Sequence, residues 1–360
     1  MLSGVYSTSS MHRMAMMTMA PIHIALPSDE SYVPGLTVTA ASIALYADPA
    51  TPLHFHILDG GIQPPTFEQF SACIRRVHPR VQFTRHRVDE GDFASLPLWS
   101  GNRMTYARLM LPRAMPDEAF VIYSDTDMLW LAPVEGLWAR RDPEKVALVV
   151  RDGYPQTETR EVAWFARHDL PFQPENYFCA GLLLLNLKRM REEQIVKQTF
   201  DFIAAHPDCQ FADQTAFNVL LHDRVEHLPQ AWQVLTRLAR KADFDHPVVL
   251  HYGGDIPWKR INWRDLLSDP VILWHHFNDQ VVLGKRGASL ARFLSPWQRF
   301  YKRALFLALH NSLVKRTIDT LCRTTARGRC CRTFDATASW IGRRRRQQFQ
   351  REWKLRLAGR

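Results

Sequence analysis

The sequence has few cysteines and no long hydrophobic run. Its 360 residues include six cysteines, without a CxxC pair or the spacing of a metal site: Cys73, Cys179, Cys209, Cys322, Cys330 and Cys331. In a chain of this length, scattered cysteines are typical of free thiols in a reducing cytoplasm. No stretch approaches the roughly 18 consecutive apolar residues that a membrane-spanning helix needs. The sequence therefore predicts neither a disulfide framework nor a membrane-spanning helix.

Residues 1–20 also lack the charged start and apolar core of a secretory signal. The segment is rich in Ser, Thr and Met. We expect it to be disordered, or the start of the chain to be assigned too far upstream. Alternative starts are offered by Met14, Met16, Met17 and Met19.

Charge is unevenly distributed along the chain. From Arg299 to Arg360 there are 17 Lys/Arg and 3 Asp/Glu, a net charge of +14, whereas the remainder carries 29 Lys/Arg and 33 Asp/Glu, a net charge of −4. The pattern indicates a slightly acidic globular body with a basic tail. An anionic membrane surface or a nucleic acid would be the natural partner of such a tail.

Apolar runs alternate with helical patterns in the body of the chain. Strands are predicted at 21–26, 53–60, 81–88 and 119–125, and helices between them at 35–47, 66–78 and 104–115, the last disturbed by Pro112. Further along, we expect strands at 146–150, 180–187, 225–228 and 247–254, and helices at 191–206 and 213–223. Such alternation is typical of a parallel, doubly wound sheet, which binds ligands at the carboxyl ends of its strands.

Two aspartates follow the apolar run "FVIYS" directly, in the motif "SDTDM". Asp125 and Asp127 flank Thr126 and project to the same side of an extended chain. Two carboxylates that close repel one another unless a cation joins them. Oxygen ligands suit Mg²⁺, Ca²⁺ or Mn²⁺, and an added imidazole favours Mn²⁺. A solvated turn is the alternative interpretation of an isolated Asp-x-Asp.

A second candidate segment is "VVLHYGGDIPWKR", residues 248–260. His251 ends an apolar run, and the paired glycines after it let the backbone approach a bulky anion. Lys259 and Arg260 could contact phosphates. A buried histidine before a turn is the simpler interpretation of this segment taken alone.

Four segments in order resemble family 8 glycosyltransferases of the bacterial lipopolysaccharide galactosyl- and glucosyltransferase kind. The first segment comprises "IHIALPSDESYVPGLTVTAASI" and "LHFHILDGGI", and the second comprises "TYARLMLP" and "VIYSDTDMLW". The third comprises "NYFCAGLLLLNLKRMRE" and "FADQTAFNVLLHDRVEHLP", and the fourth is "LHYGGDIPWKR". The resemblance spans about residues 21–265.

The resemblance implies an α/β fold of GT-A type, a Rossmann-like nucleotide-binding domain with a mixed central sheet. We expect this domain to occupy 21–280, followed by a basic, amphipathic helical tail at 281–360. The implied activity is retaining transfer of a hexose, galactose or glucose, from a UDP-sugar to a hydroxyl of a glycan or lipopolysaccharide acceptor. Mn²⁺ is the implied metal, with Mg²⁺ as the alternative.

The resemblance also assigns roles to individual residues. It implies that Asp125, Asp127 and His251 bind the metal, that Asp29 holds the uracil, and that Arg108 reaches the donor. Asp152 and Asp213 resemble carboxylates that hold sugar hydroxyls, and Gln214 lies beside the anomeric carbon. The remaining positions expected to bind the nucleotide sugar are Ser31, Thr126, Gly254 and Lys259.

Each of these residues also has a simpler structural interpretation. Asp29 could cap a helix or turn, and Asp213 could cap the helix that begins beside it. Arg108 could be a surface charge, and Gln214 could be exposed in a first helical turn. Asp152 before Gly153 is a common turn pair.

The sequence departs from the family pattern at three positions. Cys179 replaces an asparagine expected near the donor sugar, and a thiol cannot supply the donor and acceptor of an amide. Ile256 stands where a lysine is expected, in a loop one residue shorter, so we expect Lys259 or Arg260 to contact the diphosphate. Ser31 replaces an asparagine that often contacts the nucleotide.

The tail mixes aromatic residues with Lys and Arg over 289–321 and adds four arginines at 343–346. A basic amphipathic helix can lie in an anionic membrane interface. We therefore expect the protein in the cytoplasm, peripheral at the inner face of the cell membrane, and no nucleic acid partner, because no binding motif accompanies the charges. A helix packed on the body with a disordered end is the alternative.

Two other functions fit parts of the sequence. A phosphatase of the haloacid-dehalogenase type also places DxD after an apolar strand, but usually near the start of the chain and with Thr or Val where Leu129 stands here. A non-catalytic protein that binds sugar nucleotides is the second alternative, because of Cys179 and Ile256.

Overall fold

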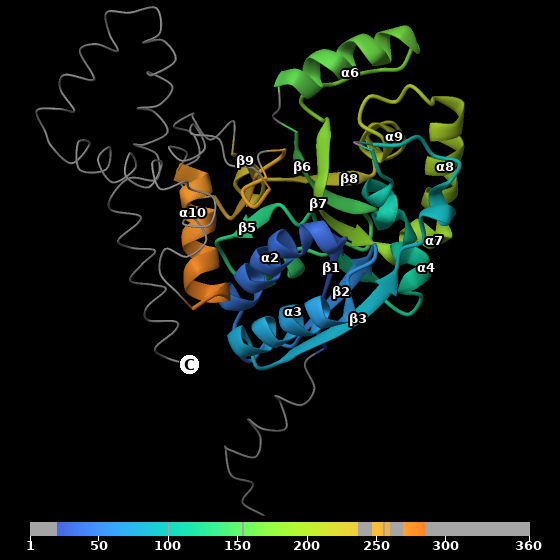
Figure 1. The fold of residues 1–360 in the computed structure, drawn as a ribbon. Helices are drawn as coiled ribbons and strands as arrows, with labels where there is room; N and C mark the ends of the chain where they lie inside the picture. Colours follow the sequence, from blue (N-terminus) through green and yellow to red (C-terminus); the bar gives the residue numbers. More distant parts are fainter. Residues whose placement is uncertain are drawn as a thin grey trace, which may run out of the picture. The chain divides into compact units, whose positions relative to one another are not determined.

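The structure is a computed structural model that describes residues 20–99, 101–152, 155–236, 247–254, 256–259 and 269–284 (Figure 1). The chain divides into two compact units, one ending at Trp232 and the other beginning at Gln233. Among the described helices, none combines the length and the apolar character needed to cross a membrane. Residues 1–19 of the segment expected at 1–20, and residues 285–360 of the tail expected at 281–360, lie outside the described residues.

A seven-stranded mixed sheet forms the centre of the first unit, in the order β3-β2-β1-β4-β7-β6-β8. Strands β3, β2, β1 and β4 run parallel, β7 runs antiparallel to both of its neighbours, and β8 is parallel to β6. The strands are β1 (Ile22–Ser28), β2 (Leu53–Asp59), β3 (Val81–Arg87), β4 (Phe120–Ser124), β6 (Ala147–Arg151), β7 (Phe178–Asn186) and β8 (Val225–Leu228).

The alternation of elements predicted an all-parallel sheet, and this is wrong for β7. All nine residues of β7 are buried, so its sequence is a continuous apolar run that carries no sign of strand direction. The mixed sheet implied by the family resemblance is confirmed.

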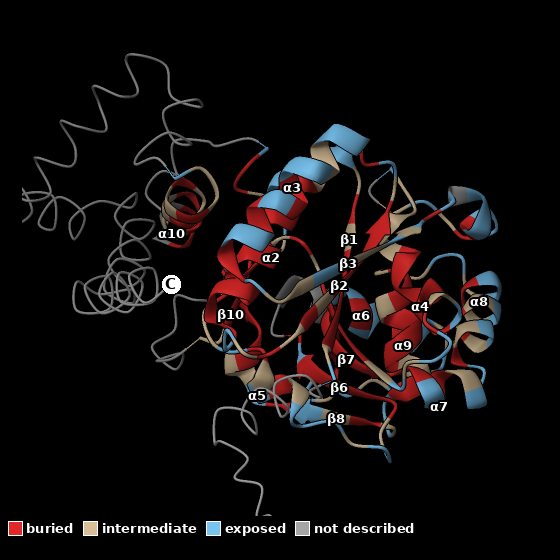
Figure 2. Ribbon diagram, turned by 90° about the horizontal axis from the view of Figure 1, so that it is seen from below, coloured by how far each residue is buried: buried red, intermediate tan, exposed pale blue. Residues whose placement is uncertain are grey.

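Helices α2 (Val33–Tyr46) and α3 (Pro64–Val77) pack against one another beside this sheet. Figure 2 shows α2 buried along most of its length, whereas α3 has one buried and one exposed face. The sequences explain the contrast: α2 is built from small and apolar residues, whereas α3 places its apolar residues at helical spacing.

Two predicted helices differ from those in the structure. The segment expected as one helix at 191–206 is two helices, α7 (Leu187–Glu192) and α8 (Ile195–Ala205), separated at Gln194 by a left-handed backbone with φ of 53°. The segment at 104–115 is a 3₁₀ helix, η3 (Met104–Met110), followed by α4 (Leu111–Ala114). Pro112 lies in the first turn of α4, where its missing N–H costs no hydrogen bond.

Short elements complete the first unit. Helix α9 begins at the expected residue, and helix α6 precedes β7. Their bounds are η1 (Glu30–Tyr32), η2 (Glu90–Phe93), β5 (Met128–Trp130), α5 (Glu135–Trp138), α6 (Pro155–Arg167), α9 (Asp213–Leu221) and η4 (Gln230–Trp232).

The described part of the second unit contains two short parallel strands, β9 (Val234–Leu235) and β10 (Val249–His251). The predicted strand at 247–254 is thus shorter than expected and ends at His251. Helix α10 (Asp269–Phe277) continues into a π-helical turn, η6 (Asn278–Val282). The rings of Trp258 and Trp274 stack at 5.5 Å and form part of the core of this unit.

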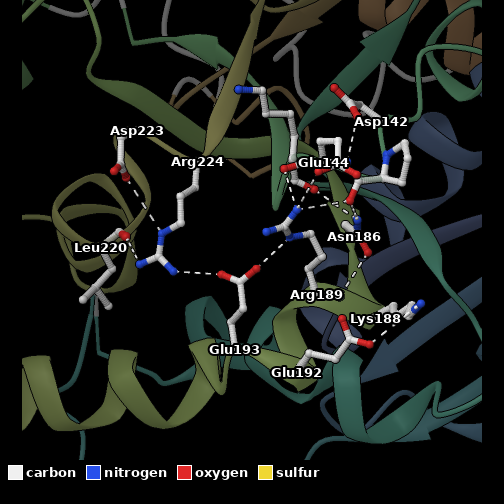
Figure 3. A network of polar contacts seen from close by, with 12 residues as sticks. Asp142, Glu144, Asn186, Lys188, Arg189, Glu192, Glu193, Leu220, Asp223 and Arg224 are labelled. Carbon is white, nitrogen blue, oxygen red and sulfur yellow. Dashed lines mark hydrogen bonds and ion pairs between the residues drawn. The ribbon is translucent and has the colours of Figure 1, made fainter.

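A polar network ties the end of β7 to α7 and to the turn before β8 (Figure 3). Asn186 caps α7 by accepting a hydrogen bond from the backbone N–H of Arg189 at 3.1 Å. Glu193 accepts from Arg189 Nε at 2.6 Å and from Arg224 at 2.9 Å. Partial burial alone would raise the pKa of Glu193, but these hydrogen bonds outweigh burial and lower it.

We predict that Glu193→Gln lowers stability at pH 7 and that its difference from wild type shrinks in acid. A carboxyl whose pKa is lowered by folding stabilises the protein above its unfolded pKa of about 4.3, and loses this contribution as pH falls through the folded value. Urea unfolding between pH 7 and pH 3 measures the difference. Glu192→Gln is the control, because Glu192 is an exposed residue of the same helix end, 3.8 Å from Lys188 in a surface ion pair. A difference independent of pH would contradict the prediction.

Candidate functional site

The two aspartates of the "SDTDM" motif lie in a turn that buried hydroxyls of α2 hold in place. Thr39 Oγ1 donates to the carbonyl oxygens of Thr126, at 3.0 Å, and Met128, at 2.7 Å. Ser42 Oγ accepts from the backbone N–H of Trp130 at 3.0 Å. These contacts explain why a helix buried on nearly all sides contains hydroxyl residues. They fix the backbone that carries Asp125 and Asp127.

Asp125 and Asp127 are both partly exposed, at the carboxyl end of β4. The Asp125 carboxylate accepts a hydrogen bond from the Tyr123 hydroxyl at 2.7 Å and lies 3.7 Å from Arg108 Nη2. Its backbone N–H donates to Gly181 O in β7 at 2.7 Å. The turn is therefore held by the sheet as well as by α2, and it is not a loose surface loop.

Arg108 is buried rather than a surface charge. Its Nε lies 3.0 Å from Asp213 Oδ2, Nη1 donates to the carbonyl oxygen of Ala180, and the guanidinium carbon lies 4.5 Å over the Tyr123 ring. Burial alone would lower the pKa of Arg108, but the carboxylates of Asp213 and Asp125 and the Tyr123 hydroxyl raise it. The arginine therefore stays charged in the interior.

Asp213 is the first residue of α9 and is 1% exposed. It is not the N-cap that its sequence position allows, because Ala212 occupies that position with a positive φ of 52°. Burial raises the pKa of Asp213, while Arg108 opposes this rise. Thr105 Oγ1 donates to its other oxygen at 3.2 Å. Both carboxylate oxygens of Asp213 therefore contact residues of η3, one Arg108 and the other Thr105.

Gln214 is half-buried, with both ends of its amide bound. Its Nε2 donates to Asp152 Oδ2 at 2.9 Å, and its Oε1 accepts from the backbone N–H of Ala180 at 3.0 Å. Asp152 is buried directly after β6, and its own N–H donates to Tyr177 O at 2.8 Å. Gln214 and Asp152 thus form a fixed pair, rather than an exposed helix residue and a turn aspartate.

The backbone of Ala180 forms hydrogen bonds with the side chains of both Arg108 and Gln214, because the pairing of β7 with β6 is interrupted at this residue. The register passes from Leu183 to Cys179, so the residues between them are missing from the ladder with β6. An irregularity of this kind frees backbone groups beside functional sites. Cys179, which replaces the asparagine of the family pattern, is a buried free cysteine at this interruption.

Asp29 and Ser31 lie just past the end of β1. Asp29 Oδ1 accepts from the N–H of Tyr32 at 3.0 Å and from Ser31 Oγ at 2.7 Å, so Asp29 caps η1. The capping interpretation of Asp29 is therefore correct as a description of its local contacts. Both residues belong to the same edge of the sheet as Asp125, because β1 and β4 run parallel.

The remaining predicted residues belong to the second unit. His251 is buried at the end of β10, with Nδ1 at 3.2 Å from the Gln233 side-chain nitrogen. Gly253 and Gly254 follow with φ of 44° and 90°, which favour glycine. Lys259 is exposed, and its backbone N–H donates to Ile256 O at 3.3 Å. Arg260 lies outside the described residues.

Several residues of the site were not predicted from the sequence. Tyr123 lies two residues before Asp125 and on the same side of the strand, a spacing that could have identified it. Tyr177, Thr105 and Glu161 carry no such signal. Glu161 is fully buried, accepts from Thr215 Oγ1 at 2.8 Å, and has its pKa raised to about 7 by burial.

We predict that Arg108→Met destabilises the protein by about 3–5 kcal/mol, because it leaves the buried Asp213 carboxylate without its cation. The double variant Arg108→Met/Asp213→Asn should recover part of this loss. Urea unfolding at neutral pH measures both. Arg113→Met is the matched control, since Arg113 is 72% exposed and pairs with Asp92 at the surface. Equal losses for Arg108→Met and Arg113→Met would contradict the prediction.

The chain is similar to known proteins in sequence and in fold. The family model described as glycosyl transferase family 8 matches residues 23–262. General stress protein A of Bacillus subtilis is 23% identical over 264 residues, 66% of this chain and 87% of that protein. A putative glycosyltransferase of Haemophilus influenzae is 25% identical over 314 residues, 83% of this chain and 88% of its own length.

Among solved structures, the galactosyltransferase LgtC in complex with donor and acceptor sugar analogues matches with a TM-score of 0.59 at 25% identity. The match covers 74% of this chain and 97% of LgtC. The expected GT-A type of α/β fold is thereby confirmed. Because the family model matches well over half of its residues, the chain belongs to glycosyl transferase family 8.

Proposed function

We propose that this glycosyltransferase moves a hexose, galactose or glucose, from a UDP-sugar to a hydroxyl of a glycan or lipopolysaccharide acceptor, with retention of configuration. The observation that carries the proposal is the fixed Gln214–Asp152 pair beside the Arg108–Asp213–Asp125 cluster. The similarity to LgtC, a galactosyltransferase solved with donor and acceptor sugar analogues, supports the choice of a hexose.

Members of family 8 generally use a divalent metal and a nucleotide sugar. We propose that Asp125, Asp127 and His251 hold the metal, and that it is Mn²⁺, with Mg²⁺ as the alternative. Two carboxylates and an imidazole form a donor set that suits Mn²⁺. When bound, the metal would neutralise the charge that develops on the departing diphosphate. Thr126, between the two aspartates, and the Gly254 loop with Lys259 would contact the nucleotide sugar.

Gln214 would orient the donor sugar at its anomeric carbon. Its amide is held at both ends, so it can present a fixed dipole but is a poor nucleophile, because its oxygen is neutral. The better nucleophiles, Asp152 and Asp213, are engaged by Gln214 and Arg108. These contacts favour attack by the acceptor hydroxyl on the face that the diphosphate leaves, with the leaving phosphate accepting the hydroxyl proton.

Arg108 is expected from the family resemblance to reach the donor. Its burial and its contacts with Asp213, Asp125 and Ala180 support an indirect role. We propose that Arg108 positions the carboxylates that face the donor, while Asp29 and Ser31 hold the uracil.

The phosphatase alternative loses its support, since the chain belongs to a glycosyltransferase family. A non-catalytic sugar-nucleotide-binding protein remains the second candidate, because Cys179 lies in β7 beside Ala180 in place of the family's asparagine.

A screen of UDP-sugars for Mn²⁺-dependent hydrolysis without acceptor tests the proposal, and Asp127→Ala should abolish that activity. Gln214→Ala should slow it by about 100-fold, as expected for loss of one preorganised dipole. Lys259→Ala should raise the Michaelis constant for the donor. The matched control is Asp201→Ala, since Asp201 is an exposed carboxylate on α8.

Two results of this screen would count against the proposal. Full activity of Asp127→Ala in the presence of a chelator would overturn the metal assignment. Binding of a UDP-sugar by the wild type with neither hydrolysis nor transfer would favour the non-catalytic candidate. Circular dichroism of each variant separates a chemical effect from loss of folding.

We further propose that the basic tail holds the enzyme at the inner face of the cell membrane, where lipid-linked acceptors are available. The support is compositional, namely the net charge of +14 from Arg299 onward and the aromatic residues among those charges. We expect the full chain to bind anionic liposomes and a chain ending at 285 to lose that binding. Sedimentation with liposomes in low and high salt measures it. Equal binding by the two chains would argue against a membrane role.

A further inference from the structure

Four histidines lie on neighbouring strands at one face of the sheet. His23 belongs to β1, His54 and His56 to β2, and His86 to β3. The Cα register pairs His23 with His54 and His56 with Thr84, so alternate residues of the three strands bring the four side chains to the same face. The opposite face carries Phe55 and Phe83, which pack toward α3.

The imidazoles contact one another through their ring nitrogens. His23 Nδ1 lies 3.0 Å from His56 Nε2, and His56 Nδ1 lies 2.9 Å from His86 Nε2. The rings of His54 and His56 are 4.1 Å apart, and His54 Nε2 lies 2.8 Å from Thr84 Oγ1. Burial lowers the pKa of His23 and lowers that of His56 to about 2, so these rings are neutral near pH 7.

We propose that His23, His54 and His56 form a site for a transition-metal ion of the Zn²⁺ class, separate from the site of the glycosyl transfer. Each of the three offers a ring nitrogen, and these nitrogens all lie within 4.8 Å of one another. Zinc takes imidazole nitrogens at about 2.0–2.1 Å in tetrahedral geometry, which places two such nitrogens about 3.3 Å apart. The 3.0 Å between His23 Nδ1 and His56 Nε2 is close to this spacing.

The surroundings of the cluster are those of a metal site rather than of three isolated rings. A ligating histidine usually donates its other N–H to a carboxylate or another acceptor, which fixes the ring and its tautomer. Here Glu118 Oε2 lies 3.1 Å from His23 Nε2, the nitrogen that faces away from His56. His86 takes the corresponding place at His56 Nδ1. Both rings therefore direct their remaining nitrogens toward one another.

A metal ion can reach the histidine site from solvent, and the site is distant from the proposed site of glycosyl transfer. His54 and His86 are only partly buried, which provides an entry path, and water would supply the fourth ligand. His23 is near the start of β1, whereas the nucleotide edge lies beyond Ser28 at its other end, about 16 Å away at strand rise. A metal here would connect β1 to β2 and stabilise the fold without taking part in transfer.

Titration of the chelator-treated full chain with Co²⁺, followed by displacement with Zn²⁺, tests the proposal. Four-coordinate Co²⁺ absorbs visible light strongly and six-coordinate Co²⁺ weakly, so the histidine site can be distinguished from the aspartate site. Asp127→Ala is the parent variant, because it lacks the other site. We expect it to bind one equivalent of Co²⁺ with four-coordinate absorption, and Zn²⁺ to raise its melting temperature.

Three variants of this parent complete the experiment. His54→Gln removes a ligand at a partly exposed position and should weaken Co²⁺ binding by about 100-fold or more. Glu118→Gln changes only the partner of His23 and should weaken it by about 10–100-fold. His227→Gln is the matched control, an exposed strand histidine outside the cluster that should leave binding unchanged. The Glu118 side chain is 38% exposed, so we expect Glu118→Gln to fold. This variant therefore tests the site even if replacing a histidine of the cluster unfolds the protein.

The proposal is overturned if the Asp127→Ala protein shows no four-coordinate Co²⁺ absorption. It is also overturned if His54→Gln binds Co²⁺ as tightly as its parent. In either case the histidines form only a hydrogen-bonded chain of imidazoles. None of these outcomes depends on glycosyl transfer, so they leave the proposed function untouched.

Discussion

The backbone of Ala180 joins the parts of the site to one another. Its carbonyl oxygen accepts from Arg108, its N–H donates to Gln214, and the next carbonyl, that of Gly181, accepts from Asp125. These three side chains and backbones come from η3, α9 and the turn after β4, which are far apart in the sequence. Arg108 and Gln214 can bind Ala180 because the β7 ladder with β6 is interrupted at this place, whereas the bond from Asp125 to Gly181 extends the pairing of β7 with β4. In a regular strand, the N–H and the carbonyl of Ala180 would pair with β6 instead.

Electrostatics adds a second constraint at the same place. Among the residues that the structure describes, Arg108 is the buried cation of this cluster: it contacts Asp213 and lies near Asp125, with Asp127 two residues further along. One positive charge among three carboxylates leaves the cluster negative, and charges taken out of water interact strongly. An additional cation is therefore favourable beside Asp125. Arg108 therefore compensates the buried carboxylates, and the remaining negative charge supports the proposed metal site at Asp125 and Asp127.

The sequence predicted the elements whose pattern is local. The strand that ends at Ser124, the aspartates after it and the start of α9 at Asp213 follow from apolar runs and spacing. The direction of β7 did not follow, because a fully buried strand is apolar in either direction. The break at Gln194 was missed, since the helical periodicity continues across it. The roles of Tyr177 and Ala180 depend on contacts between distant segments, and for Ala180 the contacts are made by backbone atoms that no side chain reveals.

The place of β7 in the sheet also sets the order in which the protein can be completed during synthesis. Strands β1 to β4 can pair as soon as they emerge, but β4 then has an open apolar edge. Strands β6 and β8 join the sheet only through β7, which is made after both β4 and β6. A ribosome that stalls before residue 186 would thus release a half-sheet prone to pairing with other chains. Strand β7 also supplies the backbone of Ala180 and Gly181, so a shortened product that ends before β7 lacks both the centre of the sheet and the backbone groups that bind Arg108, Gln214 and Asp125.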